Sequence, residues 1–113
     1  MLARVQEKVA VTDFRSLAKA PSGNRFLVYS LFPEAHVHLR ISHDSRRPEW
    51  VAINVGHSIF NPGCKVNAGV LLSDFGGGGH RGAASARFHI SKAEEYIPQI
   101  IEALQKNESN EAL

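Results

Sequence analysis

The sequence predicts an α/β fold, in which a mixed sheet of about five strands carries flanking helices. Segments in which apolar residues recur at every second position lie on both sides of a short helical segment, and the chain ends on a helical apolar stripe. The length of 113 residues is that of one domain, and 43% apolar with 21% charged residues is a globular composition. We therefore expect residues 1–113 to form a single domain.

The strands are expected at residues 9–14, 26–32, 36–42, 51–55 and 84–90. Residues 26–32 are almost continuously apolar, which is typical of a central strand that is buried on both faces. Residues 36–42 alternate, so that Val37, Leu39 and Ile41 share a face that belongs in a core. The opposite face carries the polar series His36, His38, Arg40 and Ser42, which we expect at the surface.

A short helix is expected from Asn67, which can cap its start, through Phe75. Val70 and Leu71 should face inward, and Gly76 should end the helix because glycine accepts the left-handed backbone of a C-terminal cap.

The last helix should begin at a capping box formed by Ser91 and Glu94, and Pro98 should kink or divide it. Its core stripe is Ile97, Ile100, Ile101 and Leu104. Residues 107–113 are polar and are expected to form a disordered tail.

Composition restricts the setting of the protein. With one cysteine, Cys64, the chain cannot form an internal disulfide or a multi-cysteine zinc site, and a reducing compartment fits best. The sequence has neither an apolar stretch of membrane-spanning length nor a signal peptide, so we expect a cytoplasmic protein with no membrane contact. Basic residues prevail between residues 14 and 91 and acidic ones from Lys92 onward, which favours an anionic ligand bound by the middle of the chain.

The strongest chemical signal is the run Gly76–Gly77–Gly78–Gly79 followed by His80. Consecutive glycines lower the stability of the fold, so a function should offset that cost. Glycine backbones can turn successive N–H groups toward an anion, and His80 can donate a hydrogen bond to a phosphate oxygen. The run therefore predicts a phosphate site.

The run follows a helix, whereas in a P-loop the glycines precede one. The C-terminal end of a helix is partially negative, so nearby cations must contribute to binding. The candidates are Arg40, Arg81 and Arg87, because the guanidinium fork matches phosphate oxygens.

Residues 75–84, FGGGGHRGAA, resemble the glycine-glycine-glycine-histidine signature of the DHH-associated C-terminal domain, the substrate-binding half of DHH phosphoesterases. The resemblance extends to VHLRIS at residues 37–42 and VNAGVLLSDF at 66–75, and GHSIFN at 56–61 is similar to the exopolyphosphatase-related branch, which is close to the oligoribonuclease-like one. It covers about residues 26–90, although Ser85 replaces the family's final glycine.

The resemblance implies that Gly77, Gly78, Gly79 and His80 hold a substrate phosphate and that Arg40 binds the same phosphate or another. Asn61 is a possible addition by resemblance, and Arg81 by its charge.

In the DHH family, catalysis needs a separate N-terminal domain that binds manganese ions, and its aspartate-histidine-histidine motif is absent from this sequence. We therefore expect this chain to hold no metal or other cofactor and to be inactive alone. It would be the nucleotide-binding part of a hydrolase acting on nucleotides or short oligonucleotides, with the N-terminal catalytic domain as its partner.

Other interpretations stay open. The chain could be a non-catalytic module for nucleic acid or polyphosphate, or the glycines could form a plain turn. His36 and His38 could ligate a metal, although histidines on a strand are more often plain surface residues. Trp50 could stack on a base, although a tryptophan at the start of a strand is more often half-buried in the fold. The sequence does not distinguish between mononucleotide, oligonucleotide, cyclic dinucleotide and polyphosphate, nor does it fix the oligomeric state.

Overall fold

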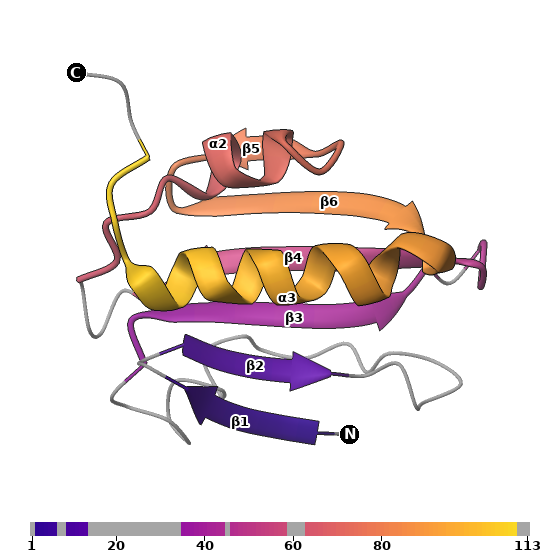
Figure 1. The fold of residues 1–113 in the computed structure, drawn as a ribbon, viewed down its shortest axis with the longest axis horizontal. Helices are drawn as coiled ribbons and strands as arrows, with labels where there is room; N and C mark the ends of the chain where they lie inside the picture. The colour runs from indigo at the N-terminus through magenta and orange to yellow at the C-terminus, as the bar shows by residue number, and fades with distance from the viewer. Residues whose placement is uncertain (1, 7–8, 14–34, 45, 59–62, 111–113) are drawn as a thin grey trace.

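The fold is a mixed six-stranded sheet with two helices in the described residues, which confirms the predicted fold class (Figure 1). The computed structural model describes residues 2–6, 9–13, 35–44, 46–58 and 63–110. The strands are β1 (Leu2–Gln6), β2 (Val9–Asp13), β3 (Val37–His43), β4 (Trp50–His57), β5 (Gly78–His80) and β6 (Ala83–His89), and the helices are α2 (Ala68–Ser73) and α3 (Ile90–Lys106).

The sheet has the order β1-β2-β3-β4-β6-β5. The β2 and β3 strands are parallel and all other neighbours are antiparallel, so the sheet is mixed as predicted. Strands β2, β3, β4 and β6 lie where the sequence places them, whereas β1 and β5 were not predicted. The strand expected at residues 26–32 lies outside the described residues.

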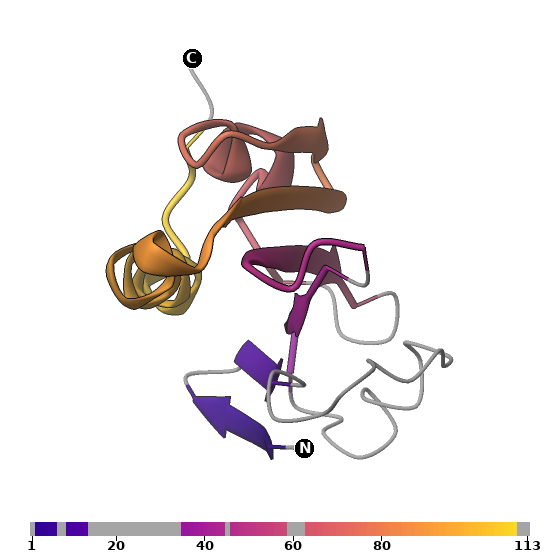
Figure 2. The ribbon, with the colours of Figure 1, turned by 90° about the vertical axis from the view of Figure 1, so that its right-hand side faces the viewer.

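Helix α3 packs across one face of the sheet and closes the core (Figures 1 and 2). Its predicted stripe is confirmed, because all four stripe residues and Ala93 are buried. On the sheet side they meet the inward-facing residues of β3, β4 and β6, which include Leu39, Ile53 and Phe88.

The expected start of α3 was wrong, and so was the alternative that Pro98 divides the helix. The helix begins at Ile90, and the His89 Nδ1 atom caps it by accepting from the Ser91 N–H at 3.1 Å, so Ser91 and Glu94 form no capping box. Pro98 does not divide the helix. Proline removes only its own N–H bond to the carbonyl of Glu94, and both residues are exposed, so water can satisfy that carbonyl.

Helix α2 covers the β5 edge of the sheet. Its predicted cap is confirmed, because the Asn67 Oδ1 accepts from the Val70 N–H at 3.1 Å. The inward direction of Val70 was wrong: it is 44% exposed, and Leu71 and Leu72 are the buried pair. Gly76 has the expected left-handed φ of +81°, and the Gly77 N–H donates back to the Leu72 carbonyl at 2.9 Å, but the helix ends earlier than predicted, at Ser73 with Asp74 as its C-cap.

Residues 107–110, which the sequence assigns to a disordered tail, hold the segment that enters α2. The Asn107 side chain accepts from the Lys65 N–H at 2.7 Å and donates to the Gly63 carbonyl at 2.9 Å. The Asn110 side chain accepts from the Asn67 N–H at 2.7 Å and donates to the Asn67 carbonyl at 3.1 Å. These bonds fix the chain just before the helix that leads into the glycine run.

Candidate phosphate-binding site

The sheet face opposite α3 brings Arg40 and the glycine run into one row. The strand register pairs Arg40 with Asn54, Asn54 with Ser85, and Ser85 with Gly78. Directly paired residues point to the same face of a sheet. Arg40 and Gly78 therefore lie on one face, three strand spacings or about 14 Å apart.

The neighbouring row places His80 on this face too. It runs from His38 through Gly56 and Ala83 to His80. Thus Arg40, Gly78 and His80 share a face, although Arg40 is far from the other two in the sequence. Gly77 lies just before β5, and a Cβ on either Gly77 or Gly79 would run into β6.

The face is covered over β2 and β3 and open over β4, β6 and β5. Thr12 and Ser42 are buried, as are His36 and His38, so the expectation that the two histidines lie at the surface was wrong. Asn54, Ser85 and His80 are exposed, and Arg40 is intermediate, at the border of the open part. We call the open part, defined by Arg40, Asn54, Ser85, Gly78 and His80, the open face.

The second half of the glycine run, Gly78 and Gly79, forms an edge strand with His80 and not a nest. Gly78, Gly79 and His80 form β5, in which successive N–H groups point alternately toward and away from β6. The expected loop of inward-turned N–H groups was therefore wrong. Any anion at β5 would meet the glycine surface, the outward N–H and the neighbouring side chains.

Three of the four glycines are explained by the fold alone. Gly76 has a left-handed φ of +81°, a conformation that favours glycine. A Cβ on Gly77 would lie 2.2 Å from the Ser85 carbonyl oxygen, and one on Gly79, whose φ is +149°, would lie 2.7 Å from that of Ala83. Gly78 is different, because its Cβ would meet nothing within 4 Å. The fold does not require glycine at position 78, and the missing side chain leaves space on the open face.

The other predicted cations differ in what they contact. The Arg87 Nε lies 3.5 Å from the Asp44 carboxylate, and the Arg87 side chain is 70% exposed. The pKa of Asp44 is lowered, first by the Arg46 N–H that it accepts at 2.8 Å and also by the Arg87 charge. Arg87 therefore has a partner in this chain. Arg81 is exposed in the turn between β5 and β6, and Asn61 lies outside the described residues.

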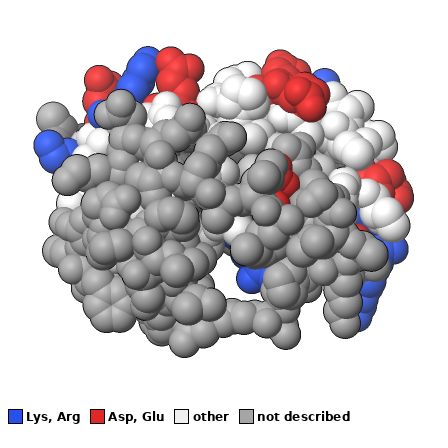
Figure 3. Space-filling model, turned by 90° about the horizontal axis from the view of Figure 1, so that it is seen from below, with Lys and Arg blue, Asp and Glu red and all other residues white. Residues whose placement is uncertain are grey.

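Seen from the β1 edge, both acidic and basic side chains of the described residues are visible (Figure 3).

A metal site at the two histidines and base stacking by Trp50 gain no support from the described residues. Within the described ranges, no group of three or more His, Cys, Asp and Glu side chains could hold a metal. Cys64 is buried, and burial raises the pKa of its thiol. Trp50 lies half-buried at the start of β4 in an edge-to-face contact with His89, with ring centroids 6.0 Å apart. None of the described helices is long and apolar enough to cross a membrane.

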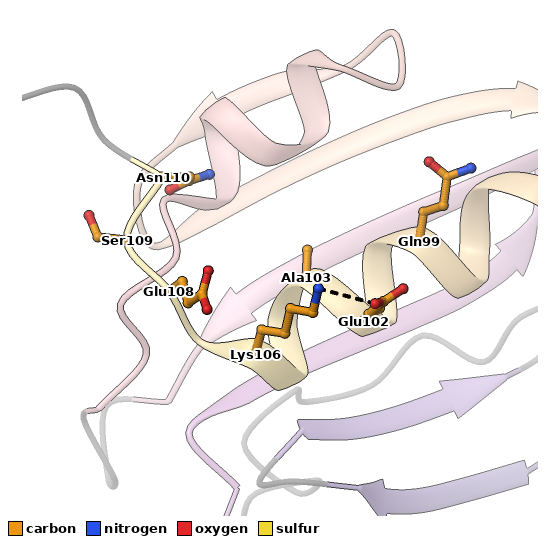
Figure 4. Close-up of a pocket in the computed structure, with 7 residues that line it drawn as sticks. All are labelled: Gln99, Glu102, Ala103, Lys106, Glu108, Ser109 and Asn110. Carbon is orange, nitrogen blue, oxygen red and sulfur yellow. Dashed lines mark ion pairs between the residues drawn. The ribbon is translucent and has the colours of Figure 1, made fainter.

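A hollow of about 400 Å³ lies elsewhere, at the C-terminal end of α3 (Figure 4). Its lining includes the Lys106–Glu102 ion pair at 3.2 Å and the residues Gln99, Ala103, Glu108, Ser109 and Asn110. Because α3 covers the opposite face of the sheet, this hollow does not belong to the open face. Its two glutamates also make it a poor place for an anion.

His57 supports the turn between β5 and β6 from the end of β4. Its N–H donates to the Gly82 carbonyl at 2.9 Å, and its ring Nε2 lies 2.9 Å from the Val66 carbonyl oxygen, to which Nε2–H donates. The imidazole thus links the segment before α2 to the strand that carries the candidate site.

We expect the stability of the protein to fall as the pH drops below 6.5, in part because of His57. Burial lowers the pKa of His57 from its ordinary value of 6.5, and the Val66 carbonyl, which favours the charged form, offsets only part of this. The unfolded chain therefore binds the proton more readily, so this contribution is complete above pH 6.5 and is lost at lower pH.

Urea unfolding at pH 7.5 and pH 5 should show a smaller difference in His57→Gln than in the wild type, because glutamine can still donate to Val66 but does not titrate. The matched control is His80→Gln, which removes an exposed imidazole. Equal pH dependence in the wild type and His57→Gln would contradict the prediction.

The fold and the open face define an α/β domain whose polar sheet surface is bordered by an arginine and a glycine-histidine strand. Solved structures share its fold, and two of them illustrate the likeness. One is PggH from Vibrio cholerae, described as a pGpG-specific phosphodiesterase, with a TM-score of 0.87 and 24% identity over 94% of this chain. The other is an exopolyphosphatase-related protein from Bacteroides fragilis, with a TM-score of 0.63 and 16% identity over 92% of this chain.

The chain spans 36% of the first of these proteins and 32% of the second, so it corresponds to about a third of each. No family model matches the sequence, and no curated protein matches it. At these identities the likeness shows the fold.

Proposed function

We propose that this chain is the phosphate- and nucleotide-binding domain of a DHH-type phosphoesterase that acts on nucleotides or short oligonucleotides. The observation that carries the proposal is the space left by Gly78. The fold does not require a glycine at this position, and the space lies on the face that also holds Arg40 and His80. A phosphate can approach a glycine backbone closely, while a guanidinium and an imidazole supply charge and hydrogen-bond donors.

The names of the two similar structures support a phosphoester or polyphosphate ligand. The sequence resemblance to the DHH-associated domain points to the same chemistry through residues 75–84. Both lines lead to one division of labour, in which this domain binds and orients the substrate. Manganese ions in a separate DHH domain would supply the nucleophile, and this chain alone would bind without hydrolysing.

The binding test is a calorimetric titration of the chain with pGpG, phosphoadenosine phosphate and a short oligonucleotide. We expect His80→Ala to weaken binding about tenfold, the loss of about one charge-assisted hydrogen bond. The matched control is His89→Asn, which removes another exposed histidine and keeps a helix-capping side chain.

Unchanged affinity in His80→Ala, with binding by the wild type, would remove His80 from the site. Hydrolysis of these ligands by the purified chain would contradict the division of labour. Failure of the wild type to bind any of the three ligands would overturn the proposed binding function of the chain.

A further inference from the structure

We propose that residues 107–110, which follow α3, hold β5 in place through α2, and that Asn110 is a positioning residue of the candidate site. We call residues 107–110 the C-terminal strap. Three features support this role: the bonds of Asn110, the close contact between α2 and β5, and the way in which the strap itself is held. The placement of β5 does not depend on which ligand binds, whereas the effect on binding rests on the proposed function and deepens it.

Asn110 bonds both backbone groups of Asn67, the residue that caps α2. Its Oδ1 accepts from the Asn67 N–H at 2.7 Å, and its Nδ2 donates to the Asn67 carbonyl at 3.1 Å, although the two residues are 43 positions apart. The Asn67 side chain in turn accepts from the Val70 N–H in the first turn of the helix. An amide that bonds both groups of one residue fixes the place and the direction of the backbone there. The start of α2 therefore depends on Asn110.

Helix α2 needs such support because it is short. It has six residues, and a helix of fewer than about 12 residues is marginal in water unless tertiary contacts hold it. Leu71 and Leu72 anchor it in the core. Its start has no comparable apolar anchor of large size, since Ala68 and Gly69 are the buried residues there. The bonds at Asn67 thus fix the end of the helix that the core holds least.

The position of α2 determines that of β5, because the two elements are joined at both ends of the strand. Just before β5, the Gly77 N–H donates to the Leu72 carbonyl at 2.9 Å. Just after it, the Arg81 carbonyl accepts from the Ala68 N–H, also at 2.9 Å. Since β5 has three residues and pairs only with β6, these two bonds are a large part of what fixes it.

Between these two bonds, the backbones of α2 and β5 lie against each other. A Cβ on Gly69 would lie 2.5 Å from the Gly79 carbonyl oxygen and 3.3 Å from that of His80. No side chain separates the helix from the strand here, so a shift of α2 must be transmitted to the glycine strand. The path from Asn110 to the candidate site therefore consists of direct contacts at every step.

The strap is bonded by amide side chains and is not tightly packed against α3. The strap and α3 together line the hollow of about 400 Å³ (Figure 4), and Glu108 and Ser109 are exposed. The Asn107 side chain adds the two bonds to Lys65 and Gly63 described above. Loss of the Asn110 amide should therefore loosen the strap and α2 without unfolding the sheet.

The test is the ¹H–¹⁵N NMR spectrum of the full chain carrying Asn110→Ala. We expect the amide signals of α2 and β5 to shift or broaden, while those of β3 stay where they are in the wild type. The melting temperature should fall by only about 5 °C, the loss of about one hydrogen bond. The matched control is Gln99→Ala, which removes an exposed amide that lines the same hollow but bonds within its own helix, to the Glu95 carbonyl.

A second variant tests the next step of the path. Gly69→Ala leaves Asn110 in place but pushes α2 away from β5, so it should move the same β5 signals. Because both substitutions act on one unit, the double variant should move these signals by less than the sum of the two single effects. Additive effects would show that Asn110 and Gly69 act independently, which contradicts the path.

Calorimetric titration with pGpG measures the consequence for the candidate site. Affinity should fall about threefold in Asn110→Ala, because the ligand binds only the fraction of molecules in which β5 is held in place. Gln99→Ala should bind like the wild type. Unchanged affinity in Asn110→Ala, with binding by the wild type, would show that Asn110 does not position the site.

The two measurements separate this inference from the proposed function. If Asn110→Ala leaves the β5 signals unchanged, or if Gln99→Ala moves them as far, the strap does not hold β5 and the inference is overturned. If the wild type does not bind pGpG, the binding role of Asn110 is overturned for this ligand. The NMR comparison still decides whether the strap holds β5.

Discussion

Gly77→Ala should destabilise the protein by about 3 kcal/mol, at the upper end of what overpacking a well-packed site costs. A Cβ at this position would lie 2.2 Å from the Ser85 carbonyl oxygen and 2.6 Å from the Ala86 Cβ. Both contacts are with β6, a central strand that also pairs with β4, so the neighbours cannot move without breaking the sheet. The extra methyl group would instead push the start of β5 away from β6.

Urea unfolding followed by circular dichroism checks this expectation, because it reports the free energy of unfolding. The matched control is Gly82→Ala in the adjacent turn, where a Cβ would come no nearer than 4.0 Å to the His57 ring. Its stability should match that of the wild type. A wild-type stability for Gly77→Ala would show that β5 is not held against β6 as the structure has it.

The class of the fold and most of its elements could be predicted because they follow local patterns. Strands β3, β4 and β6 alternate apolar and polar residues, and α3 has its stripe of four buried residues. The left-handed backbone of Gly76 after α2 also follows from a local rule, since a left-handed residue favours glycine. In each case the signal lies within a few residues of the element it predicts.

The errors arose where tertiary contacts outweigh local preference. Glycine is depleted in strands, so nothing local predicts β5, which exists because Gly78, Gly79 and His80 pair with β6. Alternation correctly placed His36 and His38 on the polar face, but burial depends on what covers the face. At the start of α3, His89 took the capping role expected of Ser91.

In the candidate site, too, the local features could be predicted and the tertiary arrangement could not. The glycine-histidine run and Arg40 could be singled out by residue type alone. Their placement on one face, and the presence of Asn54 and Ser85 between them, depend on the pairing of four strands whose residues are far apart in the sequence. No sequence pattern in this chain marks Asn54, because a single asparagine in a strand carries no periodic signal.

Gly78→Ala should leave the fold intact and weaken binding of pGpG about 100-fold, or about 2.7 kcal/mol. The new Cβ would meet nothing within 4 Å, and Gly78 is not among the glycines with a left-handed φ. Stability should therefore be unchanged or rise by about 0.4–1 kcal/mol, since alanine restricts the unfolded chain. The methyl group would project into the space where, in our proposal, a phosphate rests against the strand.

Gly78 and Gly77 are neighbours in the sequence but should respond to the same substitution in opposite ways. Gly77→Ala is expected to act on stability, and Gly78→Ala on binding, because a Cβ at position 77 would run into β6 whereas one at position 78 would meet nothing within 4 Å. Calorimetric titration with pGpG beside urea unfolding measures both effects, with Gly82→Ala as the common control. If Gly78→Ala binds like the wild type, the open space at β5 is not where the ligand lies. If it unfolds like Gly77→Ala, the space is filled in solution and the glycine at position 78 serves the fold.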